Sequence, residues 1–108
     1  MENKTNTERC SSEGLKLLGD YWSLRIIDAL HEDELRFCQL EKILTDINTA
    51  TLTKRLRQLE LSGIIKREHE TIDKQSVTYL LSEAGLGLLP ILKEIKRFTE
   101  THPSIKLA

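Results

Sequence analysis

Long apolar runs are missing from this sequence of 108 residues. No segment approaches the roughly 18 consecutive apolar residues that a membrane-spanning helix needs. The first ten residues, MENKTNTERC, are polar and lack the hydrophobic segment of a signal peptide. These two absences predict a cytoplasmic protein and exclude an integral membrane protein.

Cysteines and catalytic motifs are also scarce. The two cysteines, Cys10 and Cys38, are too few for a disulfide scaffold, and in the cytosol we expect both to be thiols. The three histidines lie too far apart in the sequence to predict a zinc site. The chain contains neither a glycine-rich phosphate loop nor a nucleophile motif. We therefore expect a protein that is not an enzyme and holds no metal or cofactor.

A strong excess of charge of either sign is absent as well, since the formal net charge is -1. This balance argues mildly against a nucleic-acid-binding protein, which is often basic overall. The distribution is uneven, however. Residues 1–47 carry six basic and ten acidic side chains, whereas residues 48–76 carry six and four and residues 77–108 carry four and three. The positive excess is small, so its attraction for phosphates would be modest and strongly salt-dependent.

The stretch Asn48–Gly63, NTATLTKRLRQLELSG, has the pattern of one short amphipathic helix. Asn48 is a good N-cap residue, and Gly63 suits the left-handed residue that ends a helix. Three leucines at i, i+4 and i+7 form one apolar stripe: Leu52, Leu56 and Leu59. The opposite side carries small hydroxyl side chains followed by cations and an amide, which suits a helix laid against nucleic acid. The stretch alone leaves an ordinary solvated surface helix as the alternative.

Shorter elements precede this stretch. A helix is expected from Glu8 to a stop at Gly19, and Asp20 can cap a second helix whose buried stripe is Trp22, Ile26, Ile27 and Leu30. Leu35–Phe37 is a candidate short strand. Cys38–Leu44 is predicted to be a helix with three inward side chains, Leu40, Ile43 and Leu44. With Asn48–Gly63, that helix makes a helix-turn-helix, in which the first helix braces the second.

After Gly63 the period of the pattern changes. Residues 64–69 and 77–81 are strand candidates, and the polar segment ETIDKQS between them has the length of a hairpin loop. A helix-turn-helix followed by such a hairpin is a winged helix. Lys74 and Gln75 at the tip could reach phosphates, and Arg67 lies on the strand that leads there.

Ser82 can cap a last helix that runs from Glu83 to about Thr101. Pro90 lies inside this pattern and should kink the helix or start a new segment. One apolar stripe is predicted along it: Leu88, Ile91, Leu92, Ile95 and Phe98. This is more apolar surface than one side of a small domain needs, which suggests a subunit interface.

An ordered set of residues resembles a known family. It comprises Cys10, Leu15, Leu18, Gly19 and Trp22, then Arg36, Phe37 and Leu40, then Leu52, Thr53, Arg55, Leu56, Leu59, Glu60, Gly63, Ile64, Ile65 and Arg67, and finally Val77, Tyr79, Leu81, Ser82, Gly85, Leu88, Pro90, Ile91 and Leu92. Together these residues resemble the HxlR-type winged helix-turn-helix regulators, relatives of the MarR group. The resemblance covers about Cys10 to Phe98, most of the chain.

The resemblance implies a mainly α fold with a small β-hairpin wing, in a single domain over residues 1–108. It implies a recognition helix at about 48–63, a wing at about 64–81 and a dimerisation helix at about 83–101. Family dimers form through the N- and C-terminal helices. Some members sense oxidants or electrophiles through the cysteine that Cys10 matches. On its own pattern, Cys10 lies on the apolar stripe of its helix, where a small buried side chain is the default use.

We therefore expect a bacterial transcriptional regulator that binds double-stranded DNA as a homodimer on a pseudo-palindromic operator, with an oxidant or small molecule as a candidate effector. The predicted DNA-binding residues are Thr49, Ala50, Thr51, Lys54, Arg55, Arg57, Gln58, Arg67, Lys74 and Gln75, and Cys10 is the candidate redox sensor. The alternative is a winged-helix module that binds protein without specific DNA binding, which the small charge excess keeps open.

Overall fold

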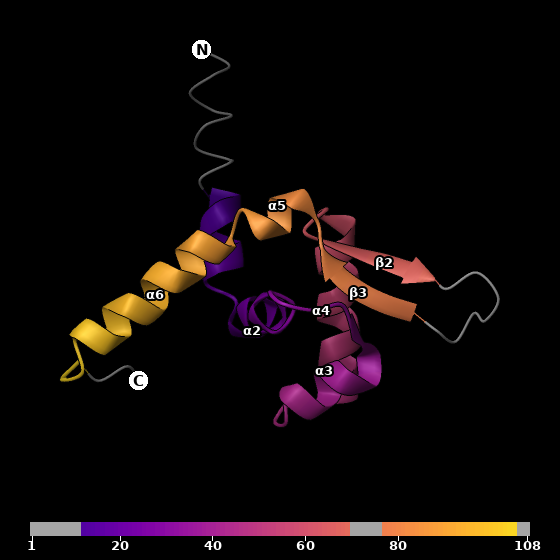
Figure 1. Cartoon of the computed structure of the whole chain (residues 1–108), viewed down its shortest axis with the longest axis horizontal. Coiled ribbons are helices and arrows are strands. Elements are labelled where there is room, and N and C mark those ends of the chain that lie inside the picture. Colours follow the sequence, from indigo (N-terminus) through magenta and orange to yellow (C-terminus); the bar gives the residue numbers. More distant parts are fainter. Residues whose placement is uncertain (1–11, 70–76, 106–108) are drawn as a thin grey trace, which may run out of the picture.

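The computed structural model describes residues 12–69 and 77–105. A helix over 12–18 is followed by five elements of the central part: α2 (Tyr21–Ala29), β1 (Leu35–Arg36), α3 (Phe37–Ile43), α4 (Thr49–Leu61) and β2 (Ile65–His69). The chain continues with β3 (Val77–Leu81), α5 (Glu83–Leu86) and α6 (Leu89–Thr101). This order of helices and strands, shown in Figure 1, confirms the predicted winged helix-turn-helix class.

Three helices begin at the residues that the sequence predicts as N-caps. The side-chain oxygens of Asp20, Asn48 and Ser82 accept hydrogen bonds from the backbone N–H three residues later, at 3.0, 2.8 and 3.1 Å. Each bond satisfies one of the donors that a first helical turn leaves without a partner. Gly63 follows the end of α4 with a φ of 80°, the left-handed conformation expected there.

The three strands form one antiparallel sheet in the order β1-β3-β2. Ile65 on β2 lies opposite Leu81 on β3, and Leu35 on β1 lies opposite Tyr79. The short strand predicted at Leu35–Phe37 therefore exists, but it ends at Arg36 because Phe37 begins α3. The tip of the wing, with Lys74 and Gln75, lies outside the described residues.

The hydrophobic core lies between α2, α3, α4 and the sheet. Its buried side chains are Ile26, Ile27, Leu30, Leu35, Leu40, Leu44, Leu52, Leu56, Leu59, Ile65, Leu81 and Leu92. The first three belong to the stripe predicted for the second helix, whereas Trp22 of that stripe is only partly buried against this core. The leucine stripe predicted for α4 is fully inside, so α4 has one fixed orientation on the domain.

One inward side chain was predicted wrongly in α3. Ile43 is 49% exposed, although Leu40 and Leu44 are buried as expected. The helix begins one residue earlier than predicted, and its buried side follows Phe37, Leu40 and Leu44 at the spacing i, i+3 and i+7. Ile43 lies about 100° away from Leu44 around the axis and therefore points away from the core.

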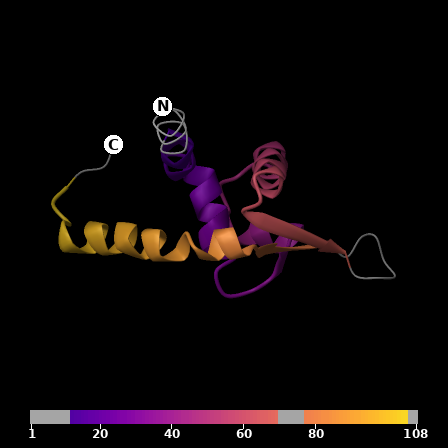
Figure 2. The same cartoon turned by 90° about the horizontal axis from the view of Figure 1, so that it is seen from above.

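The predicted helix over Glu83–Thr101 is two helices in the structure, α5 and α6. Pro90 lies in the first turn of α6, which confirms that it starts a new segment. Proline has no N–H to give to a preceding turn, but it is tolerated at the beginning of a helix. In Figures 1 and 2, α6 extends away from the rest of the domain, on the side opposite the wing.

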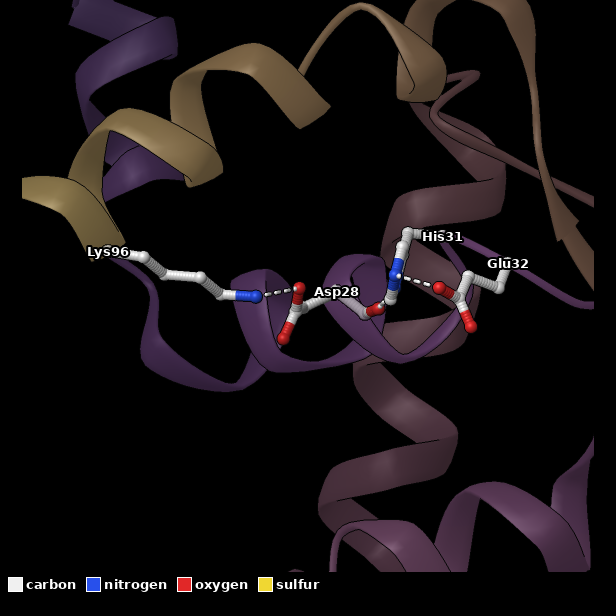
Figure 3. A network of polar contacts seen from close by, with 4 residues as sticks. All are labelled: Asp28, His31, Glu32 and Lys96. Carbon is white, nitrogen blue, oxygen red and sulfur yellow. Dashed lines mark hydrogen bonds and ion pairs between the residues drawn. The ribbon is translucent and has the colours of Figure 1, made fainter.

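One ion pair joins α6 to α2, and two contacts of His31 lie beside it at the end of α2 (Figure 3). The ammonium group of Lys96 on α6 lies 2.7 Å from a carboxylate oxygen of Asp28 on α2. At the end of α2, Nδ1 of His31 donates to the backbone carbonyl of Asp28, and Nε2 lies 3.2 Å from the Glu32 carboxylate. Chiefly because of that carbonyl, the pKa of His31 is raised above its ordinary value. None of the helices in the described ranges is long and apolar enough to cross a bilayer.

Candidate nucleic-acid interface

The exposed side of α4 is polar and positively charged. With Leu52, Leu56 and Leu59 buried, the side chains of Ala50, Lys54, Arg57 and Gln58 lie exposed on the other side of the helix. Among the residues that the structure describes, Lys54 and Arg57 form no ion pair with a carboxylate. Their charges are therefore available to an external anion.

The beginning of α4 is fixed to α3, the bracing helix. The hydroxyl of Thr49 donates to the carboxylate of Glu41 at 2.9 Å, and Thr51 is partly buried beside the Asn48 cap. The structure thus places Thr49, Ala50 and Thr51 together in the first turn of α4, as predicted. In helix-turn-helix proteins this turn of the second helix is the part that approaches the base edges.

Arg55 differs from the other predicted cations, because it lies between the exposed and the buried sides of α4. Its side chain is 26% exposed, and its Nε lies 3.1 Å from Oδ2 of Asp20, the cap of α2. The N–H does not point along this line, so the contact is an ion pair rather than a hydrogen bond. One end nitrogen, Nη1, donates to the side-chain oxygen of Gln58 at 3.1 Å.

The wing contributes Arg67, which is exposed on β2 opposite Tyr79. A hollow of about 330 Å³ lies between α4 and the base of the wing. Its lining residues are Phe37, Thr53, Leu56, Arg57, Glu60, Arg67 and Tyr79. The structure therefore brings Arg57 and Arg67 to one hollow, although they are ten positions apart in the sequence. The Glu60 carboxylate at the same place reduces the net positive charge there.

The remaining predicted site residues lie outside the described part: Lys74 and Gln75 at the wing tip, and Cys10 near the N-terminus. Two functional partners were missed in the sequence, the carboxylates of Asp20 and Glu41 that engage Arg55 and Thr49. Asp20 was recognised only as a helix cap. Its contact joins positions 35 residues apart, and no pattern in a single sequence signals such a pair.

A second surface, on α6, has the opposite character. Ile91, Ile95 and Phe98 recur at helical spacing and are 40%, 44% and 48% exposed. Beside them, a largely apolar hollow of about 210 Å³ lies between α2 and α6. We call Ile91, Ile95 and Phe98 the apolar face of α6. Large apolar side chains exposed together on one side of a helix are typical of interaction surfaces.

Comparison with known families decides the identity. A family model described as HxlR-like helix-turn-helix matches residues 17–105. The chain belongs to this family. The match confirms the resemblance drawn from the ordered residues, and it includes the helix-turn-helix, the wing and α6.

Curated relatives of this HxlR-like chain are transcriptional regulators of the helix-turn-helix type. It is 37% identical over 82 residues to BH0655 of Halalkalibacterium halodurans, with 75% of this chain and 73% of the relative covered. It is 32% identical over 103 residues to YybR of Bacillus subtilis, with 93% and 81% covered. Both are described as HTH-type transcriptional regulators.

Solved structures agree with this placement. The oxidized form of the redox regulator HypR superposes with a TM-score of 0.77 at 28% identity, covering 91% of this chain and 98% of that one. The reduced form of the transcriptional regulator YodB from B. subtilis gives a TM-score of 0.75 at 27% identity, covering 82% and 87%. The predicted role as a transcriptional regulator with a winged helix-turn-helix is thereby confirmed.

Proposed function

We propose that this regulator inserts α4 into the major groove of an operator, where Thr49, Ala50 and Thr51 approach base edges and Lys54 and Arg57 bind phosphates. The observation that carries the proposal is the exposure of Lys54 and Arg57 on the outer side of α4, where neither forms an ion pair with a described residue. The other side of α4 is fixed by its three buried leucines. Arg57 and Arg67 at one hollow suit a single strand of the backbone that passes between α4 and the wing.

The protein acts as a homodimer in this proposal, with the apolar face of α6 against a second copy. Ile91, Ile95 and Phe98 are too exposed for the isolated chain, and a two-fold interface would bury them on both partners at once. Two copies also double the small positive charge presented to DNA. A two-fold dimer requires a pseudo-palindromic site with half-sites about one helical turn apart.

A selection experiment tests this function. The full chain is used to enrich binding sites from a random-sequence duplex library, and affinity is then measured by fluorescence anisotropy at several salt concentrations. We expect a pseudo-palindromic consensus. The variant Arg57→Gln should weaken binding and lower the slope of log K against log salt by about one for each phosphate that is no longer bound.

Lys93→Gln, which removes the same charge from α6, is the matched control and should change neither affinity nor slope. If the wild-type chain enriches no sequence and is not retained on DNA resin at low salt, the fold serves protein binding instead.

We further propose that oxidation regulates DNA binding, with Cys10 as the sensor. It is supported by the description of one structural neighbour as a redox regulator. Diamide takes two electrons and two protons from two thiols as these join in a disulfide. Cys10 supplies one thiol, and either Cys38 or the Cys10 of a second copy supplies the other.

The test compares operator binding with and without diamide in the wild type, in Cys10→Ser and in Cys38→Ser, alongside non-reducing electrophoresis. We expect the wild type to change its affinity and Cys10→Ser to be insensitive. Equal sensitivity of the wild type and Cys10→Ser would remove Cys10 from this role. Cys38 is exposed on α3. The variant Cys38→Ser shows whether the second thiol is that of Cys38 or that of Cys10 in a second copy.

A further inference from the structure

A continuous line of polar contacts runs from the start of α2 to the outer side of α4. The Asp20 carboxylate caps α2 through the backbone N–H of Ser23 at 3.0 Å, and the Ser23 hydroxyl also donates to it. The same oxygen, Oδ2, lies 3.1 Å from Nε of Arg55, and Nη1 of Arg55 donates to Gln58 at 3.1 Å. Three side chains thereby connect a helix cap to the surface that the proposed function gives to DNA.

The guanidinium group determines how the Gln58 amide lies. Arginine carries only donors, so the atom of the amide that faces Arg55 must be the oxygen, Oε1. The NH₂ group then lies on the side away from Arg55. In the major groove, guanine presents two acceptors, N7 and O6, whereas adenine presents one acceptor and one donor. An amide that offers its NH₂ suits guanine, whereas the two-bond pairing of a glutamine with adenine also needs the oxygen.

Asp20 also connects this line to the helix over 12–18. The backbone N–H of Asp20 donates to the carbonyl of Leu17 at 3.1 Å, and the N–H of Gly19 donates to the carbonyl of Leu15 at 2.8 Å. The cap of α2 is therefore the closing turn of the preceding helix as well. A displacement of that helix would move the carboxylate against which Arg55 rests.

We infer that Arg55 is a positioning residue rather than a DNA contact: held by Asp20, it orients the Gln58 amide so that α4 prefers guanine at the base pair facing Gln58. The inference rests on the proposed function and adds a specificity determinant to it. It removes Arg55 from the group of phosphate-binding cations and gives Asp20, an acidic residue, a favourable effect on DNA binding.

The direction in which Asp20→Asn changes operator affinity distinguishes a positioning role of Arg55 from direct contact of Arg55 with DNA. Asparagine is as good an N-cap as aspartate, so Asp20→Asn keeps the cap of α2 while it removes the charge that holds Arg55. We expect this variant to bind the selected operator about fivefold more weakly. If Arg55 instead bound a phosphate, removing a competing carboxylate would free its charge, and Asp20→Asn would bind more tightly.

The salt dependence gives a second, independent readout. Arg55→Met keeps most of the side-chain volume but removes the charge and every donor. We expect its affinity to fall about fivefold with an unchanged slope of log K against log salt. Arg57→Gln, two positions along the same helix, provides the comparison, because its slope should fall by about one.

Base preference is a third readout, and it would stay unchanged in the Arg55 variants if Arg55 only stabilised the fold. Operators with each base pair substituted are titrated with the wild type, Gln58→Ala, Arg55→Met and Arg55→Lys. Gln58→Ala identifies the base pair that Gln58 faces, at which the wild type should prefer guanine over adenine about tenfold. Arg55→Met should lose this preference or shift it to adenine. Lysine can pair with Asp20, but its single nitrogen lacks the rigid fork that places Nε at Asp20 and Nη1 at Gln58, so Arg55→Lys should recover affinity and not the guanine preference.

The outcomes are distinct. A lower salt slope in Arg55→Met, tighter binding by Asp20→Asn, or a base preference that neither Gln58→Ala nor Arg55→Met alters would overturn the role assigned to Arg55 and leave the proposed function standing. If the wild-type chain selects no DNA at all, the proposed function itself fails. If Arg55→Met unfolds, Asp20→Asn and Arg55→Lys still decide the question, because asparagine still caps α2 and lysine still pairs with Asp20.

Discussion

Helices α4 and α6 each contain 13 residues and each lie against α2, yet they expose opposite chemistry. All three leucines of the α4 stripe are buried, and its exposed side is polar and cationic. In α6 only Leu92 is buried, and Ile91, Ile95 and Phe98 are exposed. In the proposed function this difference corresponds to two partners of different nature, a polyanion for α4 and an apolar surface of a second copy for α6. Burial on the inner side fixes each helix, and what remains outside determines what it can bind.

The two helices also differ in how a cation joins them to α2. Arg55 of α4 meets Asp20 at the N-terminus of α2 with both side chains less than one-third exposed. Lys96 of α6 meets Asp28 near the other end with 57% and 37% of the side chains exposed. Solvent screens the second pair more than the first, so the attachment of α6 depends less on charge.

The largest difference should appear when one apolar side chain is shortened in each helix. Leu52→Ala in α4 removes a fully buried side chain and should lower the free energy of unfolding by about 3 kcal/mol. Ile95→Ala in α6 should cost less than about 1 kcal/mol at a dilution at which dimers dissociate, because Ile95 is already exposed. Urea unfolding at low protein concentration measures both. Similar losses of unfolding free energy in the two variants would contradict the contrast between α4, whose apolar stripe is buried, and α6, whose apolar face is exposed.

Gly85 determines how the chain passes from the wing to α6, and its substitution should have the next largest effect. A Cβ atom at this position would lie 2.3 Å from the carbonyl oxygen of Ile64, which accepts from the backbone N–H of Ser82. We expect Gly85→Ala to lower the free energy of unfolding by about 2 kcal/mol, because the backbone at Ile64 or at Gly85 must move to make room for the Cβ atom. Gly14→Ala is the control, since nothing lies within 4 Å of its Cβ position. Equal stability of the two variants would show that Gly85 is not constrained.

Removing the ion pair of α6 should have a smaller effect. Lys96→Gln breaks the contact with Asp28, and for so exposed a pair we expect a loss of about 0.5 kcal/mol at low salt and less at high salt. Thermal unfolding at two salt concentrations measures this, with Lys93→Gln as the variant that removes an equal charge from the same helix. A loss that did not shrink with salt would mean that Lys96 acts through packing.

The smallest effect is a pH dependence from His31, which lies beside the same pair (Figure 3). Both ring nitrogens face acceptors, first the Asp28 carbonyl and then the Glu32 carboxylate, so the pKa of His31 is raised above 6.5. The protonated ring therefore stabilises the fold fully below about pH 6.5, and this contribution is lost as the pH rises through the folded-state pKa. Relative to His31→Gln, the wild type should melt higher at about pH 5.5 and lose that advantage by about pH 8. An advantage that grew with pH would contradict a raised pKa.

The sequence predicts the local features of this molecule well. Asp20, Asn48 and Ser82 begin helices where they were expected to, because a cap depends on neighbours within three positions. The α4 stripe is also a local pattern. Ile43 was placed wrongly because the spacing allows more than one buried side in so short a helix, and packing selects the side of Phe37, Leu40 and Leu44. The break between α5 and α6 was predicted from Pro90 only as one of two outcomes.

The candidate site was predictable as a set but not in its internal contacts. Positions 49–58 on one helix are necessarily close together, so their grouping follows from the helix alone. The contact of Arg55 with Asp20 and the shared hollow of Arg57 and Arg67 depend on how α4 packs against α2 and the wing. These tertiary contacts distinguish Arg55, which pairs with Asp20, from Lys54 and Arg57, which form no ion pair among the described residues. The periodicity of the sequence does not distinguish them.

One measurement tests the division of roles between α4 and α6 most directly: molar mass by light scattering together with the salt slope of operator binding, for Arg57→Gln and for Ile95→Ser/Phe98→Ser. We predict that Arg57→Gln stays a dimer with a reduced slope. The α6 variant should be a monomer that binds one half-site with about half the slope of the dimer. A dimeric α6 variant with unchanged DNA binding, or a monomeric Arg57→Gln, would contradict the assignment of DNA to α4 and of the second copy to α6.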